Sequence, residues 1–215
     1  MSEKNGNENK GDLTEGVLHH DTLEKNPFEL FDDWYSHAQA SEINDPDAMA
    51  LASVNAHGIP SVRIVLLKAW SADGFVFFTN YNGRKAHELL ETKKAAACIH
   101  WKTLRRQVRI VGDVEKISAS KSDEYFSSRA RGSQIGAWAS EQSQPLKTRD
   151  ELSKKVAEFE EKFADKPVPR PPHWGGFIIK PVEIEFWADG AFRLHDRFKL
   201  QPDENNHWQA TRLNP

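Results

Sequence analysis

Residues 184–198 read IEFWADGAFRLHDRF, and this stretch predicts a β-hairpin. An apolar, aromatic run comes first, the turn dipeptide Asp189-Gly190 follows, and a second strand-like run comes after it. Because successive side chains of a strand point to opposite faces, Arg193, His195 and Arg197 would share one face. Such a face favours an anionic or electron-rich ligand, although a solvated strand would show the same spacing.

The chain before and after this hairpin is dominated by short strand patterns. Apolar runs bounded by turn residues occur at 49–54, 61–70, 74–80, 95–101, 105–117, 177–187, 192–200 and 208–213. Helical patterns are fewer, with one helix starting at Asn26-Pro27 and others at 84–92, 120–129 and 149–163. Strand and helix do not alternate regularly, so we predict a mainly β (α+β) fold, an antiparallel barrel with flanking helices.

The domain organisation and cellular class follow from composition. No linker divides residues 26–215, so we expect one domain preceded by a flexible tail over 1–25, which is rich in Glu, Asn, Lys and Gly. The net charge of −3 argues against a general nucleic-acid binder. A single cysteine, Cys98, and the lack of a signal peptide or membrane-length apolar run favour a soluble cytoplasmic protein. We expect Cys98 to be a buried structural thiol.

Several kinds of catalytic site are excluded by missing motifs. The chain has no GxGxxG after a strand, no GxxxxGK[ST] and no GxSxG, and its nine histidines show no metal-ligand spacing. We therefore expect no metal site, no P-loop and no nucleophile elbow.

Two elements suit phosphate groups. Arg84 and Lys85 open a predicted helix, where free backbone N–H groups bind anions, although two solvated charges would give the same pattern. Tyr125 and Arg129 are spaced to share a helical face, and Ser133 extends that line if the helix continues. A solvated helix stripe would explain the second set equally well.

Two further elements carry polar groups. Arg63 and Lys68 bracket a strand and would point to opposite faces, so they would serve two ligands unless a bulge realigned them. Gln142-Ser143 is a polar pair in a loop, and the basic run 102–109 is typical of a charged hairpin turn. Together these elements indicate a redox or transfer enzyme that uses a phosphorylated cofactor on a phosphorylated substrate.

The chain resembles the pyridoxine (pyridoxamine) 5′-phosphate oxidase family. The matching segments run in order over residues 26–215: RIVLLK at 63–68, FTN at 78–80, RKAH at 84–87, RQV at 106–108, YFSSR at 125–129, SQIGAW at 133–138, WGGF at 174–177, IEFW at 184–187, RLHDRF at 193–198 and RLNP at 212–215. So many ordered matches are far more specific than any single motif.

The resemblance implies an FMN-binding split β-barrel that works as a homodimer with FMN at the subunit interface and a C-terminal dimerisation region. By resemblance the FMN contacts are Arg63, Ile64, Val65, Leu66, Lys68, Phe78, Thr79, Arg84, Lys85, Gln107, Gln142, Ser143, Trp187 and Arg197. The implied contacts to the substrate phosphate are Lys68, Tyr125, Arg129 and Ser133. The implied contacts to the substrate ring are Arg193, Leu194 and His195, of which Arg193 and His195 are the catalytic residues.

The reaction implied by the resemblance is oxidation of pyridoxine or pyridoxamine 5′-phosphate by O2 to pyridoxal 5′-phosphate, with release of H2O2. Two alternatives are a related flavin oxidase of phenazine metabolism and a flavin- or pyridoxal-phosphate-binding protein without turnover. One departure from the family is that residues 13–20 lack its Arg-x-x-Tyr element, which closes over the substrate. Asp45 does match a family position near the active site.

Overall fold

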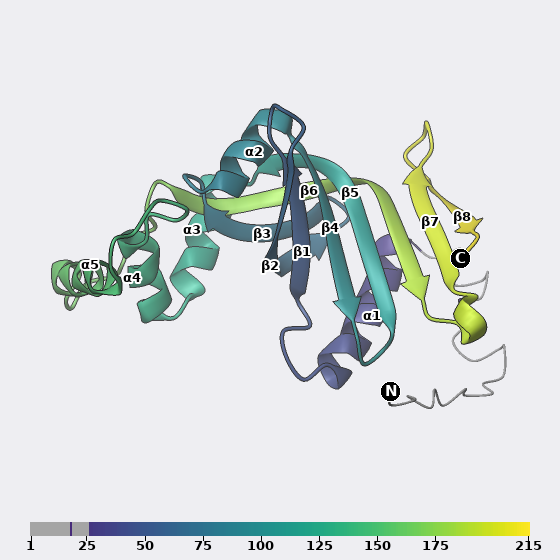
Figure 1. The fold of residues 1–215 in the computed structure, drawn as a ribbon, viewed down its shortest axis with the longest axis horizontal. Helices are drawn as coiled ribbons and strands as arrows, with labels where there is room; N and C mark the ends of the chain where they lie inside the picture. Colours follow the sequence, from purple (N-terminus) through teal and green to yellow (C-terminus); the bar gives the residue numbers. More distant parts are fainter. Residues whose placement is uncertain (1–17, 19–25) are drawn as a thin grey trace, which may run out of the picture. The chain divides into compact units, whose positions relative to one another are not determined.

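The computed structural model describes residue 18 and residues 26–215. Its elements are α1 (Pro27–Ser41), β1 (Ala48–Val54), β2 (Pro60–Ser71), β3 (Gly74–Asn80), α2 (Arg84–Thr92), β4 (Lys94–Trp101), β5 (Arg106–Lys116), α3 (Ala119–Ser128), α4 (Arg131–Ala139), α5 (Arg149–Lys162), β6 (Trp174–Ala188), the 3₁₀ turn η2 (Ala191–Arg193), β7 (Asp196–Pro202) and β8 (Trp208–Leu213) (Figure 1). No described helix has both the length and the apolar character needed to cross a membrane.

The strands form an antiparallel barrel, as predicted. They are hydrogen-bonded in the order β3-β2-β1-β4-β5-β6-β7-β8, and an additional pairing of β3 with β6 closes β1 to β6 into a ring. In that closing pair Phe77 lies opposite Phe177. The turn before β3 requires glycine, because Gly74 has a φ of +135° and a Cβ there would lie 2.1 Å from the Ile179 carbonyl oxygen.

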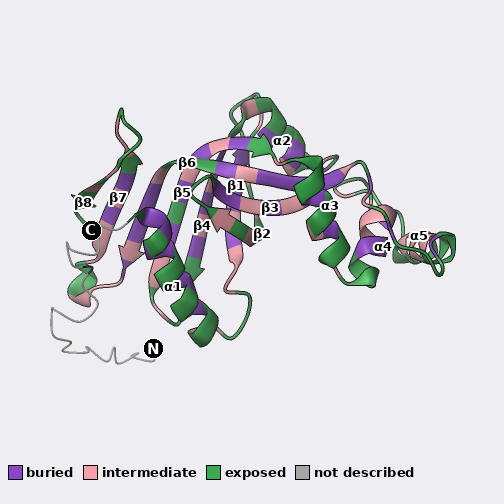
Figure 2. Cartoon of the chain, turned by 180° about the vertical axis from the view of Figure 1, so that it is seen from behind, coloured by how far each residue is buried: buried purple, intermediate pink, exposed green. Residues whose placement is uncertain are grey.

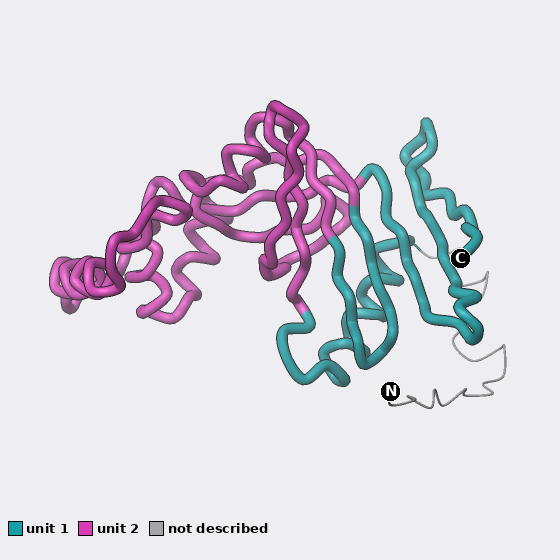
Figure 3. The backbone as a smooth tube through the Cα atoms, viewed as in Figure 1, with its two compact units in different colours: residues 1–46, 98–110, 182–215 teal, residues 47–97, 111–181 magenta. Residues whose placement is uncertain are grey.

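The residues form two compact units, and β4, β5 and β6 contribute to both (Figure 3). Unit 1 comprises residues 1–46, 98–110 and 182–215, and unit 2 comprises residues 47–97 and 111–181. The assignment of 26–215 to one domain stays a prediction. Of the expected flexible tail over 1–25, which includes the stretch without the Arg-x-x-Tyr element, only Leu18 is described. It is buried in unit 1, and its backbone N–H donates to Asp196 Oδ2 at 3.2 Å.

The core of unit 1 is aromatic and is built around α1. Asn26 caps this helix as predicted, with its Oδ1 accepting from the Phe28 N–H at 3.0 Å. One helix face is buried and the other exposed (Figure 2). On the buried face, Trp34 packs edge-to-face on Phe186 with ring centroids 5.2 Å apart, and it also contacts Trp101.

The predicted hairpin exists, but its second strand begins later than predicted. β6 ends at Ala188 and β7 starts at Asp196, so Arg193 and His195 lie in the connecting segment and do not share a strand face with Arg197. The connection is longer than an Asp-Gly turn because Phe192 and Arg193 both take left-handed conformations, with φ of 55° and 65°.

The helix predicted over 120–129 is confirmed as α3 (Ala119–Ser128), to within one residue at each end. α3 ends at Ser128, and α4, a helix that was not predicted, begins at Arg131. The break is stabilised by Gln134 of α4, whose Nε2 donates to the Phe126 carbonyl at 2.9 Å and to the Ser127 carbonyl at 3.3 Å. Tyr125 and Ser133 therefore belong to two helices, so the condition under which Ser133 would extend the helical line of Tyr125 and Arg129 is not met.

Candidate active site

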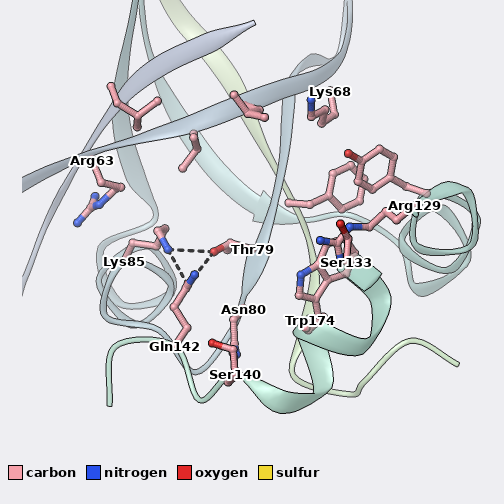
Figure 4. A pocket seen from close by; sticks show the side chains of 17 residues that line it. Arg63, Lys68, Thr79, Asn80, Lys85, Arg129, Ser133, Ser140, Gln142 and Trp174 are labelled. Carbon is pink, nitrogen blue, oxygen red and sulfur yellow. Dashed lines mark hydrogen bonds between the residues drawn. The ribbon is translucent and has the colours of Figure 1, made fainter. Parts of the chain in front are cut away.

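A cavity of about 530 Å³ lies in unit 2, and it brings together most of the predicted site residues (Figure 4). Its predicted lining residues are Arg63, Ile64, Val65, Leu66, Lys68, Phe78, Thr79, Lys85, Tyr125, Arg129, Ser133 and Gln142. Asn80, Gly136, Ala137, Ser140 and Trp174 also line it and were not predicted as site residues. All of these except Ser140 carried a signal, because Asn80 lies in the FTN segment, Gly136 and Ala137 lie in SQIGAW, and Trp174 lies in WGGF.

β2 supplies both cations that bracket the RIVLLK segment. The pairing of β2 with β3 shifts register between Leu67 and Ala69. Such a register shift interrupts the strict alternation of side chains between the two faces of a strand. Arg63 and Lys68 both line the cavity. Ile64, Val65 and Leu66 line it too, so residues from both faces of β2 border this cavity.

Lys85 forms the centre of the first polar cluster. Its Nζ donates to Gln142 Oε1 at 2.7 Å and to Thr79 Oγ1 at 3.0 Å (Figure 4). Burial lowers the pKa of Lys85, and the nearby Arg63 lowers it further. Among the described residues no carboxylate pairs with this ammonium group. The cluster therefore holds a positive charge that an anionic ligand would neutralise.

Arg129 is the centre of the second polar cluster, and its guanidinium is not fully hydrogen-bonded by the described residues. Its Nη1 is buried and has no hydrogen-bond partner among the described residues. The guanidinium lies 4.6 Å from the centre of the Trp174 ring, and burial lowers its pKa, although Tyr125 opposes that effect. An unpartnered buried donor is costly, and a phosphate oxygen would satisfy it. Ser133 and the Tyr125 hydroxyl supply further hydrogen-bonding groups beside it.

Stacked aromatic rings form one wall of the cavity. Phe78 stacks on Tyr125 with centroids 3.9 Å apart and on Trp174 with centroids 5.4 Å apart. The planes are inclined by only 17° and 10°. The wall gives the cavity an apolar, aromatic lining beside Arg129, which is common in sites for small organic molecules.

The other two cations of the cavity have carboxylate partners within the protein. Lys68 Nζ pairs with Asp47 Oδ2 at 2.6 Å, and Arg63 Nη2 lies 3.3 Å from Glu88 Oε2. The cavity thus contains two compensated cations and two uncompensated ones, Lys85 and Arg129. Two uncompensated cations in one cavity fit two phosphate groups, so the residues present fit a phosphorylated cofactor together with a phosphorylated substrate.

Arg84 and Ser143, both predicted to bind FMN, line a smaller cavity of about 310 Å³ in unit 2. Ser143 Oγ accepts from the Arg84 backbone N–H at 3.3 Å, across the loop that follows α4. Arg84 Nε donates to Glu88 Oε1 at 2.8 Å. Of the two residues that open α2, Lys85 therefore faces the main cavity and Arg84 the smaller one.

The remaining predicted residues belong to unit 1, and none of them lines the main cavity: Gln107, Trp187, Arg193, Leu194, His195 and Arg197. The Arg197 guanidinium forms two hydrogen bonds with the Glu185 carboxylate, at 3.0 and 3.2 Å, and this pairing raises its pKa. The His195 ring lies 4.7 Å from the Trp187 ring, and its Nδ1 accepts from the Gly190 N–H at 3.2 Å.

Arg193 and Leu194 are exposed in the segment between β6 and β7. Asp45, also in unit 1, is exposed and has a φ of 43°. In the described part of the chain no group of acidic, histidine and cysteine side chains could hold a metal ion.

Comparison with known proteins gives consistent matches over nearly the whole chain. Residues 36–163 match the family model "Pyridoxamine 5′-phosphate oxidase", and residues 174–215 match "Pyridoxine 5′-phosphate oxidase C-terminal dimerisation region". A pyridoxine/pyridoxamine 5′-phosphate oxidase of Rhizobium etli is 55% identical over 190 residues, covering 88% of this chain and 92% of the relative. One of Brucella anthropi is 55% identical over 195 residues, covering 90% and 96%.

Solved structures show the same fold. PhzG from Burkholderia lata, solved in complex with tetrahydrophenazine-1-carboxylic acid, superposes with a TM-score of 0.85 at 30% identity, covering 93% of this chain and 98% of that one. A pyridoxamine 5′-phosphate oxidase-related, FMN-binding protein from Nostoc punctiforme has a TM-score of 0.72 at 16% identity, with coverages of 89% and 99%. The second match supports the fold alone.

Proposed function

The chain belongs to the pyridoxine/pyridoxamine 5′-phosphate oxidase family, and from this premise we propose that it oxidises pyridoxine or pyridoxamine 5′-phosphate to pyridoxal 5′-phosphate. The observation that carries the proposal is the pair of uncompensated cations, Lys85 and Arg129, in one cavity. When bound, FMN would supply the redox chemistry by accepting a hydride from C4′ and passing the electrons to O2.

Lys85, Thr79 and Gln142 are the residues that we assign to the FMN phosphate. Their hydrogen-bonded cluster is already assembled, so the donors are in place before the ligand arrives. Arg84 and Ser143 add an exposed guanidinium and a hydroxyl next to this cluster. The backbone of 63–66 and the side chain of Phe78 line the same cavity and would border the flavin ring.

Arg129, Tyr125 and Ser133 are the residues that we assign to the substrate phosphate, with Lys68 between the two ligands. An ammonium group has three donors, and Asp47 takes one of those on Lys68. Two donors are left, which matches a residue that contacts both FMN and substrate. Holding both ligands in one cavity converts the hydride transfer into a reaction between positioned groups.

PhzG of Burkholderia lata raises the alternative of a phenazine substrate, because its structure contains a phenazine carboxylic acid. Nη1 of Arg129, buried and with no partner among the described residues, favours the phosphorylated vitamers, since phosphate accepts more hydrogen bonds than a ring carboxylate does. The 55% identity to two named oxidases, against 30% to PhzG, favours the same choice.

We assign Arg193 and His195 to the substrate ring. Left-handed backbone at Phe192 and Arg193 is a strained conformation of the kind that persists at functional sites. Nδ1 of His195 is occupied by protein groups, because the Gly190 N–H lies 3.2 Å and Asp189 Oδ1 3.1 Å from it, which leaves Nε2 for the substrate. His195 would therefore bind and orient the substrate, while Arg193 would stabilise the charge that develops during hydride transfer.

Arg193→Ala is expected to lower kcat by on the order of 100-fold and to leave FMN retention nearly unchanged. Arg193 is exposed and belongs to unit 1, whereas the Lys85 cluster is built entirely from unit 2 residues, so the substitution should remove charge stabilisation and leave that cluster intact. Stopped-flow flavin reduction and FMN titration measure the two effects separately. Parallel losses of turnover and FMN binding would contradict this role.

We also propose that the chain is a homodimer with FMN at the interface, supported by the match of 174–215 to a dimerisation region. β2 carries an apolar stripe, defined here as Val62, Ile64 and Leu66, whose members are 70%, 64% and 39% exposed. Such a stripe beside the cavity is typical of a surface that a partner covers. The partner would also bring a second copy of the unit 1 residues that do not line the cavity.

Val62→Asp is expected to raise the dimer dissociation constant by at least about 100-fold, because the carboxylate would be buried without a partner. Sedimentation velocity across a concentration series measures this. Leu146→Asp is the matched control, since Leu146 is also an exposed apolar residue (49%) but lies in the loop before α5. A Val62→Asp protein that sediments like wild type would rule out the stripe as the interface.

The experiment that tests the function is anaerobic mixing of the FMN-loaded protein with each phosphorylated vitamer. Bleaching of the flavin absorbance, reversed by air with formation of pyridoxal 5′-phosphate, is the expected result. A protein that holds FMN but is bleached by neither vitamer would refute the oxidase and favour a binding role. Bleaching by a dihydrophenazine alone would favour the phenazine alternative.

A further inference from the structure

Glu88 is the most completely hydrogen-bonded carboxylate near the proposed FMN site, and the proposed function assigns it no role. It lies on α2 and is only 4% exposed. Its Oε2 accepts from Ser53 Oγ at 2.5 Å and from Ser61 Oγ at 2.6 Å, and it lies 3.3 Å from Arg63 Nη2. Its Oε1 accepts from Arg84 Nε at 2.8 Å.

The same network occupies both terminal nitrogens of Arg63. Nη1 donates to Ser53 Oγ at 2.6 Å and to the Leu51 carbonyl at 3.2 Å. Nη2 donates to Ser61 Oγ at 2.5 Å and to Glu88. Among the described residues, this leaves only the Nε–H of Arg63 for a ligand, so this guanidinium is fixed by the protein. Within the same described part of the chain, Arg84 is held through its Nε, which leaves its two terminal amino groups for a phosphate.

The charges around the cluster explain why a carboxylate is needed there. Arg63, Arg84 and Lys85 are three cations, and Glu88 is the carboxylate that pairs with two of them. Burial raises the pKa of Glu88, but hydrogen bonds from Ser53, Ser61 and Arg84 outweigh that effect and hold the pKa at about 2. Glu88 is therefore ionised at neutral pH despite its burial.

We infer that Glu88 is a positioning residue of the cofactor site: it holds Arg63 and Arg84 in place and acts as their counter-ion until a phosphate arrives. The inference rests on the proposed function, since it takes the FMN phosphate as the natural anion of this cluster. Without the carboxylate, the cations would repel one another in the free protein, and a bound phosphate would relieve that repulsion. Glu88 would then matter more to the free protein than to the FMN complex.

Glu88→Gln tests this by thermal unfolding without ligand and with FMN, riboflavin or inorganic phosphate. The Tm of the free variant is expected to fall by on the order of 10 °C, as for a broken buried ion pair. FMN and inorganic phosphate should recover most of this loss. Riboflavin lacks the phosphate, so it should shift the Tm of variant and wild type equally. Glu115→Gln is the control, because Glu115 also pairs with a cation, Lys180, but is 57% exposed.

A second variant keeps the test decisive if the first one folds poorly. Adding Arg84→Gln to Glu88→Gln removes one of the uncompensated cations, so the double variant should be more stable than Glu88→Gln alone. Three outcomes would show a merely structural role for Glu88. The Tm of Glu88→Gln could fall equally with and without phosphate, riboflavin could restore it, or the double variant could be no more stable than Glu88→Gln. A wild-type protein that FMN does not stabilise would instead refute the cofactor proposal, while the inorganic phosphate arm still decides the role of Glu88.

Acid titration gives an independent readout. The pKa of Glu88 lies below its ordinary value of 4.5, so its contribution to stability is complete above about pH 4.5 and is lost as the pH falls toward 2. Glu88→Gln should remove this part of the acid sensitivity of the wild-type protein. A variant as acid-sensitive as wild type over that range would overturn the inference.

Discussion

Arg129→Ala is expected to raise the KM for both phosphorylated vitamers by about 100- to 1,000-fold and to leave FMN affinity unchanged. The magnitude follows from removing a charge-assisted hydrogen-bond donor to the phosphate. The Arg129 guanidinium is partly buried against the rings of Trp174 and Phe126, which reduces the solvent screening of its charge. Steady-state kinetics with pyridoxine 5′-phosphate and with pyridoxine separates the phosphate contribution, because pyridoxine should respond little to the change.

The stability of the Arg129→Ala protein is a second test of the same assignment. Nη1 of Arg129 is buried with no hydrogen-bond partner among the described residues, which is a cost that alanine removes. We therefore expect the Tm of the free variant to stay within a few degrees of wild type, the usual trade between stability and activity at a binding site. Arg149→Ala, in the exposed first turn of α5, is the matched control. A large fall in Tm with an unchanged KM would assign Arg129 to the core instead.

The predictions were correct for the helices and strands whose ends are marked by local turn and cap residues. The bounds of β3 and α2 agree with the predictions, because Gly74 and the Asn82-Gly83 turn interrupt the apolar pattern clearly. The cap of α1 at Asn26 was predicted for the same reason. The prediction of an antiparallel barrel followed from counting such strands, and the pairing of β3 with β6 confirms it.

The errors arose where contacts between side chains distant in sequence determine the backbone conformation. The RGSQIGAWA sequence of α4 contains two glycines and has weak helix propensity, yet Gln134 joins this helix to the end of α3. The segment after Ala188 departs from a hairpin turn because Asp189 pairs with Arg105 and also lies 3.1 Å from His195 Nδ1. Propensity and periodicity contain no information about such contacts.

The site could be predicted in its residue types but not in its charge balance. Arg63, Lys68, Lys85 and Arg129 were all recognised as candidate anion ligands, and the structure places them around one cavity. Arg63 and Lys68 have carboxylate partners, whereas Lys85 and Arg129 have none among the described residues. This difference depends on packing between β1, β2 and α2. The difference decides which of the four cations can pair with an anionic ligand, and Lys85 is one of them.

Lys85→Met is expected to raise the FMN dissociation constant by about 100-fold, so that the purified protein loses its yellow colour. Nζ of Lys85 is the charged member of the cluster with Thr79 and Gln142, and no described carboxylate competes with a phosphate for it. Quenching of FMN fluorescence measures the affinity. Riboflavin binding, which involves no phosphate, should change far less.

Lys85→Met should also leave the free protein as stable as wild type, because the charge that it removes is disfavoured there by burial and by Arg63. Lys154→Met, on the exposed surface of α5, is the control and should retain FMN. Because the pKa of Lys85 is lowered, raising the pH should neutralise this group earlier than an ordinary lysine, and wild-type FMN affinity should fall on the alkaline side. That fall should be absent in Lys85→Met. An alkaline loss of affinity that persists in the variant would place the FMN phosphate away from Lys85.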